Sequence, residues 1–135
     1  MPITEATNEI ESLLDSKKMR PKRREDIKAQ IDTLIEAVQY GFLTIDNGNK
    51  ITMTLESPIT SGANPITEIE FKYRVSPDIL RVNISKLKGG DMFAQLMSVG
   101  LSYVTTANVV EAVINKLEQS DRAVFDSLSM VFFPQ

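Results

Sequence analysis

Residues 42–55, FLTIDNGNKITMTL, decide the fold of this chain. Apolar side chains alternate with threonines on both sides of a short polar segment, and a period of two is typical of a β-strand with one buried face. Asn47 and Gly48 tolerate the positive φ angles of a tight turn, so this pair indicates a β-hairpin. The stretch therefore predicts two antiparallel strands, 42–45 and 50–55.

A third strand is predicted at residues 66–73, after a turn-rich segment. Pro58 lies before that segment and is expected to end the regular pairing of the second strand, because proline has no N–H to donate. One face of the third strand carries Thr67, Ile69, Phe71 and Tyr73, and the other carries Ile66, Glu68, Glu70 and Lys72. Such a meander over residues 42–73 is stable only when helices cover its apolar face.

Two amphipathic helices are expected before the sheet. Residues 4–17 carry apolar side chains at helical spacing, with acidic residues toward the start, where the helix dipole favours them. Pro21 suits the first turn of a second helix, and Gly41 stands where a C-cap glycine is expected. The apolar positions of this second helix are Ile27, Ile31, Leu34, Ile35 and Val38. Residues 1–41 are therefore expected to form an N-terminal helical hairpin.

Short helices are expected after the sheet, within residues 77–133. Ser76 and Asp121 are typical of helix starts, and Asn108 with Glu111 resembles a capping box. The predicted fold class is α+β, with the N-terminal helical hairpin, a small three-stranded antiparallel sheet and a C-terminal bundle of short helices. Because the chain has 135 residues, we expect the hairpin and the α+β domain, 42–135, to form one compact unit.

The composition lacks most side chains that catalysis and metal binding use. Histidine and cysteine are absent, which removes the usual general base, the thiol nucleophile and the usual nitrogen and sulfur ligands of zinc. We therefore expect no enzyme activity, catalytic residue, cofactor, metal site or small-molecule substrate. A net charge of −3 creates no field that attracts nucleic acid or an anionic membrane, so neither is an expected partner.

Nothing in the sequence predicts a membrane span or an export signal. The start at Met1 lacks the basic and apolar segments of a secretory signal, and no run of about 18 apolar residues occurs. A location in the cytosol is therefore expected.

Four local patterns suggest other chemistry, and each has a plainer structural interpretation. Glu68 and Glu70 share a strand face that is suited to a cation or, more simply, to solvent. Residues 46–49 resemble part of a calcium loop but are better explained as a hairpin turn. Asp91 opposes anion binding at the glycine pair before it. The basic run 17–24 lacks interleaved aromatic residues for nucleic acid, and we interpret it as a corner between helices.

The most informative feature is an excess of apolar side chains toward the carboxyl end. Methionine and phenylalanine surfaces repack around varied partners, which suits a protein that holds a hydrophobic segment of another polypeptide. Phe132 and Phe133 project about 100° apart on a helix, so only one of them faces a core comfortably. Core packing is the alternative and accounts for much of the excess. The predicted partner-binding residues are Met92, Phe93, Leu96, Met97, Phe132 and Phe133.

Several short motifs occur in a recognisable order. An apolar strand, a proline, a turn and a strand that begins Ile-Thr-Glu precede a Pro-Asp turn, short helices and a closing helix. These motifs fall at Leu55, Pro58, Ile66-Thr67-Glu68, Pro77-Asp78, Leu117, Asp121 and Val131 to Phe133. This order, over about residues 51–133, resembles the small tail assembly chaperones of contractile-tailed phages and prophages.

The resemblance implies a function and a set of partners. A tail assembly chaperone coats the long, hydrophobic tape measure protein in the cytoplasm of the bacterial host, before the tail tube protein polymerises around it, and then leaves. The resemblance therefore implies binding to the tape measure protein, to the tail tube protein or to both, together with self-association. It implies no catalytic group.

Two other hypotheses remain open. The helical hairpin, 1–41, has no counterpart in compact members of that family, and such an addition is compatible with a structural subunit of a phage tail, baseplate or connector, located in the virion. A small-molecule enzyme or a metal protein would require a cluster of carboxylates that sequence spacing does not reveal.

Overall fold

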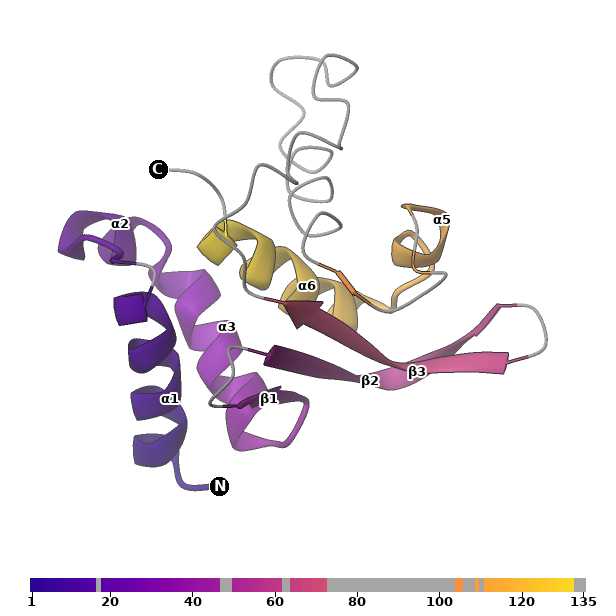
Figure 1. Cartoon of the computed structure of the whole chain (residues 1–135), viewed down its shortest axis with the longest axis horizontal. Coiled ribbons are helices and arrows are strands. Elements are labelled where there is room, and N and C mark those ends of the chain that lie inside the picture. The colour runs from indigo at the N-terminus through magenta and orange to yellow at the C-terminus, as the bar shows by residue number, and fades with distance from the viewer. Residues whose placement is uncertain are drawn as a thin grey trace, which may run out of the picture.

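A computed structural model describes residues 1–16, 18–46, 50–61, 64–72, 104–105, 109 and 111–132. Its fold is α+β, with N-terminal helices, a three-stranded antiparallel sheet and short C-terminal helices (Figure 1), which confirms the predicted fold class. The elements are α1 (Ile3–Ser16), α2 (Pro21–Asp26), α3 (Lys28–Gln39), β1 (Leu43–Ile45), β2 (Lys50–Ser61), β3 (Asn64–Lys72), α5 (Glu111–Ile114) and α6 (Gln119–Phe132).

The helices α1 and α3 lie side by side and run in opposite directions (Figure 1). Each buries one apolar stripe, as its helical spacing predicts. The buried residues of the two stripes are Ala6, Ile10, Leu13, Leu14, Leu34, Ala37 and Val38. The Met1 ammonium donates a hydrogen bond of 3.2 Å to the Gln39 carbonyl, which joins the start of α1 to the end of α3.

The second helix of the hairpin is interrupted, whereas its apolar spacing predicts a continuous helix. The backbone of Ile27 has φ −109° and ψ 26°, outside the helical region, and separates α2 from α3. The Ile27 side chain is buried, and the break allows the short helix α2 to turn toward the end of α6, where Arg23 bonds to a carbonyl. Tertiary packing has therefore overridden local helix propensity at this residue.

The sheet has the order β1-β2-β3 and is antiparallel throughout. Leu43 stands opposite Met53, and Met53 stands opposite Ile69, so these three side chains share the face that is buried. β2 continues past Pro58 to Ser61, beyond its predicted end, because a bulge accommodates the proline. Beyond the bulge, β2 and β3 form an arm that extends away from the helical pair (Figure 1).

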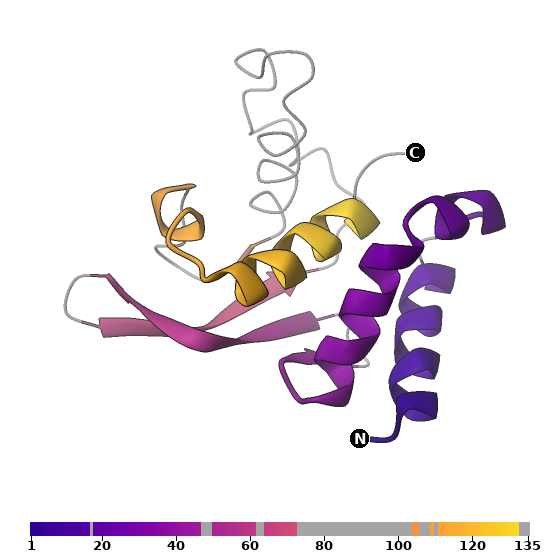
Figure 2. The ribbon, with the colours of Figure 1, turned by 180° about the vertical axis from the view of Figure 1, so that it is seen from behind.

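The core lies between the sheet and the helix α6, which crosses the sheet (Figure 2) and also packs against α3. Phe71 of β3 and Phe125 of α6 are fully buried, with ring centroids 5.8 Å apart. Leu128 and Val131 are also fully buried along the same face of α6. The predicted apolar face of the third strand is therefore confirmed at Ile69 and Phe71, and α6 covers it.

Part of the predicted C-terminal bundle lies outside the described residues. This holds for the helices that we expect between residues 77 and 101 and for the cap at Asn108. The helix predicted from 109 to 117 is observed as the shorter α5, and the last helix is observed as α6.

Candidate functional site

The partner-binding residues predicted from the sequence are not placed by the structure. Met92, Phe93, Leu96, Met97 and Phe133 lie outside the described residues. Phe132 ends α6, but its side chain is also outside the description. These six residues therefore stay a prediction. Three other apolar side chains of α6, Phe125, Leu128 and Val131, belong to the core and are not available to a partner in the folded protein.

Exposed apolar side chains gather instead at one end of the α1–α3 pair. Met1 is 54% exposed, Ile3 is 59% exposed and Tyr40 is 65% exposed, and these are the large exposed apolar residues among those described. The hydrogen bond from the Met1 ammonium to the Gln39 carbonyl places Met1 close to Tyr40. Exposed aromatic residues of this kind are common at sites that bind other proteins.

The end of α3 forms a Schellman motif, which orients Tyr40 and Phe42. Gly41 has φ +83° and donates a hydrogen bond of 3.2 Å to the Val38 carbonyl, while the Phe42 N–H donates one of 2.8 Å to the Ala37 carbonyl. A non-glycine residue at Gly41 would be strained at this φ. The chain therefore turns sharply, and Tyr40 is left exposed while Phe42 is half-buried. The predicted C-cap at Gly41 agrees with this geometry.

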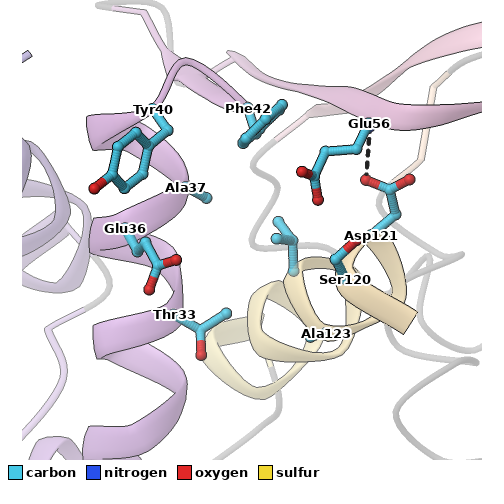
Figure 3. Close-up of a pocket in the computed structure, with 10 residues that line it drawn as sticks. Thr33, Glu36, Ala37, Tyr40, Phe42, Glu56, Ser120, Asp121 and Ala123 are labelled. Atoms are coloured by element: carbon cyan, nitrogen blue, oxygen red, sulfur yellow. Dashed lines mark hydrogen bonds between the residues drawn. The ribbon is translucent and has the colours of Figure 1, made fainter. Parts of the chain in front are cut away.

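A pocket of about 220 Å³ lies beside Tyr40, between α3, Phe42 just before β1, the bulge of β2 and the first turns of α6 (Figure 3). Its apolar wall includes Ala37, Phe42 and Val124. Its polar wall includes Glu36 from α3 and Glu56 from β2, so two carboxylates approach the pocket from opposite sides (Figure 3). A volume below the ~300–1,000 Å³ of small-molecule sites suits one side chain better than a whole cofactor.

Asp121 lines this pocket and comes from a distant part of the sequence. Its carboxylate accepts hydrogen bonds from the backbone N–H groups of Glu56, at 2.9 Å, and Ser57, at 3.1 Å. These N–H groups are free to bond because residues 55–58 of β2 stand opposite Thr67 alone, between the pairs Thr54–Glu68 and Ile59–Ile66. Asp121 therefore fixes the bulge, and the bulge carries the exposed side chain of Glu56 (Figure 3).

Glu36 and Glu56 are exposed, and their carboxylates have no ion pair or hydrogen bond within the described part of the chain. Glu36 lies in the last turn of α3, where the helix dipole disfavours negative charge. An acidic residue at that place does not stabilise the helix, so its presence favours a role outside the fold.

A wider depression, of about 470 Å³, adjoins Tyr40 on its other side. Met1, Glu9, Val38 and Leu43 are among the residues that line it. Tyr40 lines both this depression and the pocket of Glu36 and Glu56. We call this region, with Met1, Glu9, Glu36, Tyr40 and Glu56, the Tyr40 surface.

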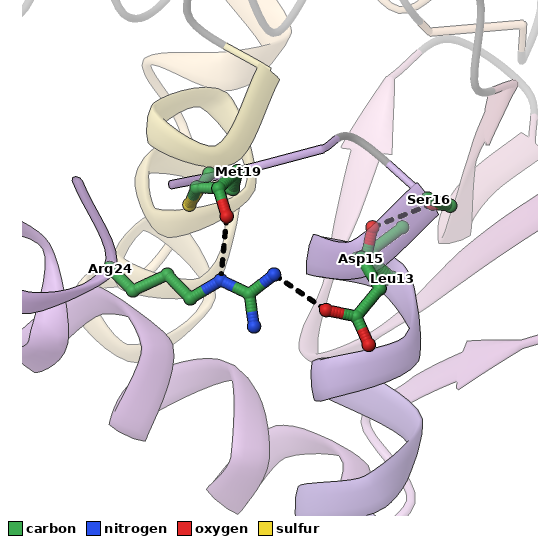
Figure 4. A network of polar contacts seen from close by, with 5 residues as sticks. All are labelled: Leu13, Asp15, Ser16, Met19 and Arg24. Atoms are coloured by element: carbon green, nitrogen blue, oxygen red, sulfur yellow. Dashed lines mark hydrogen bonds and ion pairs between the residues drawn. The ribbon is translucent and has the colours of Figure 1, made fainter. Parts of the chain in front are cut away.

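The basic run lies at the opposite end of the α1–α3 pair, around α2, as a corner between helices (Figure 1). Arg24 donates a hydrogen bond of 3.0 Å to the Met19 carbonyl and forms an ion pair of 2.6 Å with Asp15 (Figure 4). Arg23 donates a hydrogen bond of 3.2 Å to the Met130 carbonyl near the end of α6. Both arginines are half-buried and tie the corner to its neighbours.

The other patterns considered from the sequence have these positions. Glu70 forms an ion pair of 3.1 Å with Lys50 on the polar face of the sheet, and Glu68 is exposed there. Residues 47–49 and Asp91 lie outside the description. Across the described ranges, no group of three or more acidic side chains is placed to hold a metal ion. In the same ranges, no helix has the length and hydropathy that a membrane crossing requires.

Sequence reasoning missed the Tyr40 surface because its residues come from three separate elements. None of these elements has an unusual sequence pattern of its own. The one indication in the sequence is the position of Tyr40, directly before the C-cap glycine. Comparison of the chain with protein-family models, with curated proteins and with solved structures gave no match.

Proposed function

We propose that this protein binds another polypeptide, and that it does so as a phage tail assembly chaperone for the hydrophobic tape measure protein. The observation that supports binding most directly is Tyr40, an aromatic side chain that is 65% exposed and lines two hollows. One of these hollows is also lined by two carboxylates that have no partner in the described part of the chain. The order of motifs from about residue 51 onward supports the choice of partner.

The physical argument concerns what a holding protein requires. A tyrosine buries a large area at a small cost in side-chain entropy, and its hydroxyl tolerates both water and a partner. An acidic surface keeps a complex with a hydrophobic chain soluble. The apolar segment around Met92 and Met97 is expected to add adaptable contacts.

Co-expression with the tape measure protein of the same genome tests this proposal. The wild-type protein is expected to keep the tape measure protein in the soluble fraction and to co-purify with it. Tyr40→Ala is expected to lower the co-purified amount at least about fivefold, because loss of an aromatic contact in a binding site costs ~1–2 kcal/mol or more. Thr60→Ala, at an exposed position on the β2–β3 arm, is the matched control and is expected to change nothing.

Two outcomes would contradict this function. A tape measure protein that stays insoluble with the wild-type protein would exclude the holding role. Recovery of the protein from purified phage particles at a fixed copy number would show a permanent subunit of a tail, baseplate or connector in place of a chaperone.

A further inference from the structure

From the chemistry of the Tyr40 surface, we infer that it binds a basic segment of the partner polypeptide, with a lysine or arginine side chain beside Tyr40 and between Glu36 and Glu56, and an apolar neighbour against Phe42. This inference rests on the proposed function and specifies the chemistry of the bound segment. It concerns a site distinct from the predicted apolar residues between Met92 and Phe133.

Charge complementarity carries the first step. Glu36 and Glu56 line the same pocket from opposite walls, and Glu9 lines the adjoining depression. The carboxylates of all three lack a partner within the described residues. A cationic side chain that enters the pocket therefore gains two carboxylate neighbours without displacing an existing ion pair.

The aromatic ring carries the second step. Tyr40 is the residue shared by the pocket and the depression, so a side chain bound in either hollow lies close to Tyr40. The face of a tyrosine ring attracts a lysine ammonium or an arginine guanidinium, whereas it has no such attraction for a carboxylate. The apolar wall of Ala37, Phe42 and Val124 suits the methylene stem of the same side chain or an apolar neighbour.

The position of Glu36 carries the third step. α3 has no acidic residue in its first turn and no basic residue in its last turn, and Glu36 lies in that last turn. This arrangement opposes the helix dipole on the very face that lines the pocket. A bound cation at that place interacts favourably with both the Glu36 carboxylate and the carbonyl end of α3.

The bound segment is assigned to a partner and not to the basic corner of a second copy. Arg23 and Arg24 of that corner already bond within their own chain. Lys18, Arg20 and Lys22 are exposed, but the apolar residue among them, Met19, is only 3% exposed. The corner therefore offers positive charge, but it does not offer an apolar side chain that could pack against Phe42 and Met1.

Binding of synthetic peptides tests the inference. The probe is a fluorescein-labelled peptide of about twelve residues in which three basic residues alternate with leucine and alanine, and its two analogues carry glutamine or glutamate in place of the basic residues. Fluorescence anisotropy with the wild-type protein is expected to show binding of the basic peptide at least about tenfold tighter than that of the glutamine analogue at low salt, and a smaller ratio at high salt.

A pair of double variants separates the site from net charge. Glu36→Gln with Glu56→Gln is expected to weaken binding of the basic peptide about tenfold, as removal of two carboxylate contacts implies. Glu11→Gln with Glu25→Gln removes the same charge from exposed positions that do not line the pocket, and it is expected to leave binding within about twofold. Circular dichroism is expected to show that both variants are folded.

Three outcomes would overturn the inference. The first is equal binding of the basic and glutamine peptides, and the second is equal loss of binding in both double variants. The third is self-association, by sedimentation equilibrium, that the Glu36→Gln, Glu56→Gln variant alone abolishes, since the bound segment would then be a second copy. If the basic peptide does not bind while the wild-type protein still solubilises the tape measure protein, the proposed function stands without this inference. If the basic peptide binds as expected while the tape measure protein stays insoluble, the proposed function alone is excluded.

Discussion

At the scale of single residues, Asp121 shows how one buried side chain positions the pocket. It is 3% exposed, and its carboxylate accepts two backbone N–H groups that the bulge of β2 leaves without a strand partner. The sequence shows Asp121 only as a residue near a helix start, which is the role we predicted from it. Its two hydrogen bonds join it to residues that lie 65 and 64 positions earlier in the sequence, and no local pattern encodes such contacts.

Asp121→Asn is expected to destabilise the protein by about 2 kcal/mol, because an amide NH₂ replaces one accepting oxygen and leaves a backbone N–H without its bond. Urea unfolding followed by circular dichroism measures this change. Asp126→Asn is the matched control, since its ion pair with Arg122 is a partly exposed i,i+4 pair worth at most about 0.5 kcal/mol. Equal destabilisation by the two substitutions would mean that Asp121 acts only through its charge.

At the scale of elements, the sequence predicts what depends on local periodicity and turn chemistry. Alternation in 42–55 predicts β1 and β2, and Gly41 predicts the end of α3. Two features were not predicted, because they depend on contacts distant in sequence. One is the break at Ile27, which turns α2 toward α6, and the other is the continuation of β2 past Pro58. The candidate site was also not predicted, because α3, β2 and α6 each contribute residues to it.

Arg23 links two of these elements, and its removal is expected to cost about 1–2 kcal/mol. Its guanidinium donates to the Met130 carbonyl near the C-terminal end of α6, where the helix dipole favours positive charge. Arg23→Ala therefore removes a charged hydrogen bond between α2 and α6, and thermal unfolding measures the loss. Lys22→Ala, at an exposed neighbouring position, is expected to change the melting temperature little. If Lys22→Ala lowered the melting temperature as much as Arg23→Ala, the effect would belong to α2 in general and not to the Arg23 hydrogen bond.

At the scale of the whole molecule, charge and apolar exposure are arranged along the α1–α3 pair. The basic corner around α2 lies at one end of the pair (Figure 1). Tyr40 follows the other end of α3, where Glu36, together with Glu9 of α1 and Glu56 of β2, lines the two hollows that Tyr40 shares. The net charge of −3 conceals this segregation, which is why composition alone indicated no charged surface. The acidic end combines apolar area with unpaired charge, and this combination suits an amphipathic basic segment of another chain.

Hydrogen–deuterium exchange with and without the tape measure protein tests the central claim most directly, since it reports where a partner covers the folded protein. The account predicts slower exchange at the Tyr40 surface, over the start of α1, the end of α3 and the bulge of β2, with the β2–β3 arm around the exposed Thr60 unchanged. A complex that forms while those three segments exchange at their free rates would contradict it.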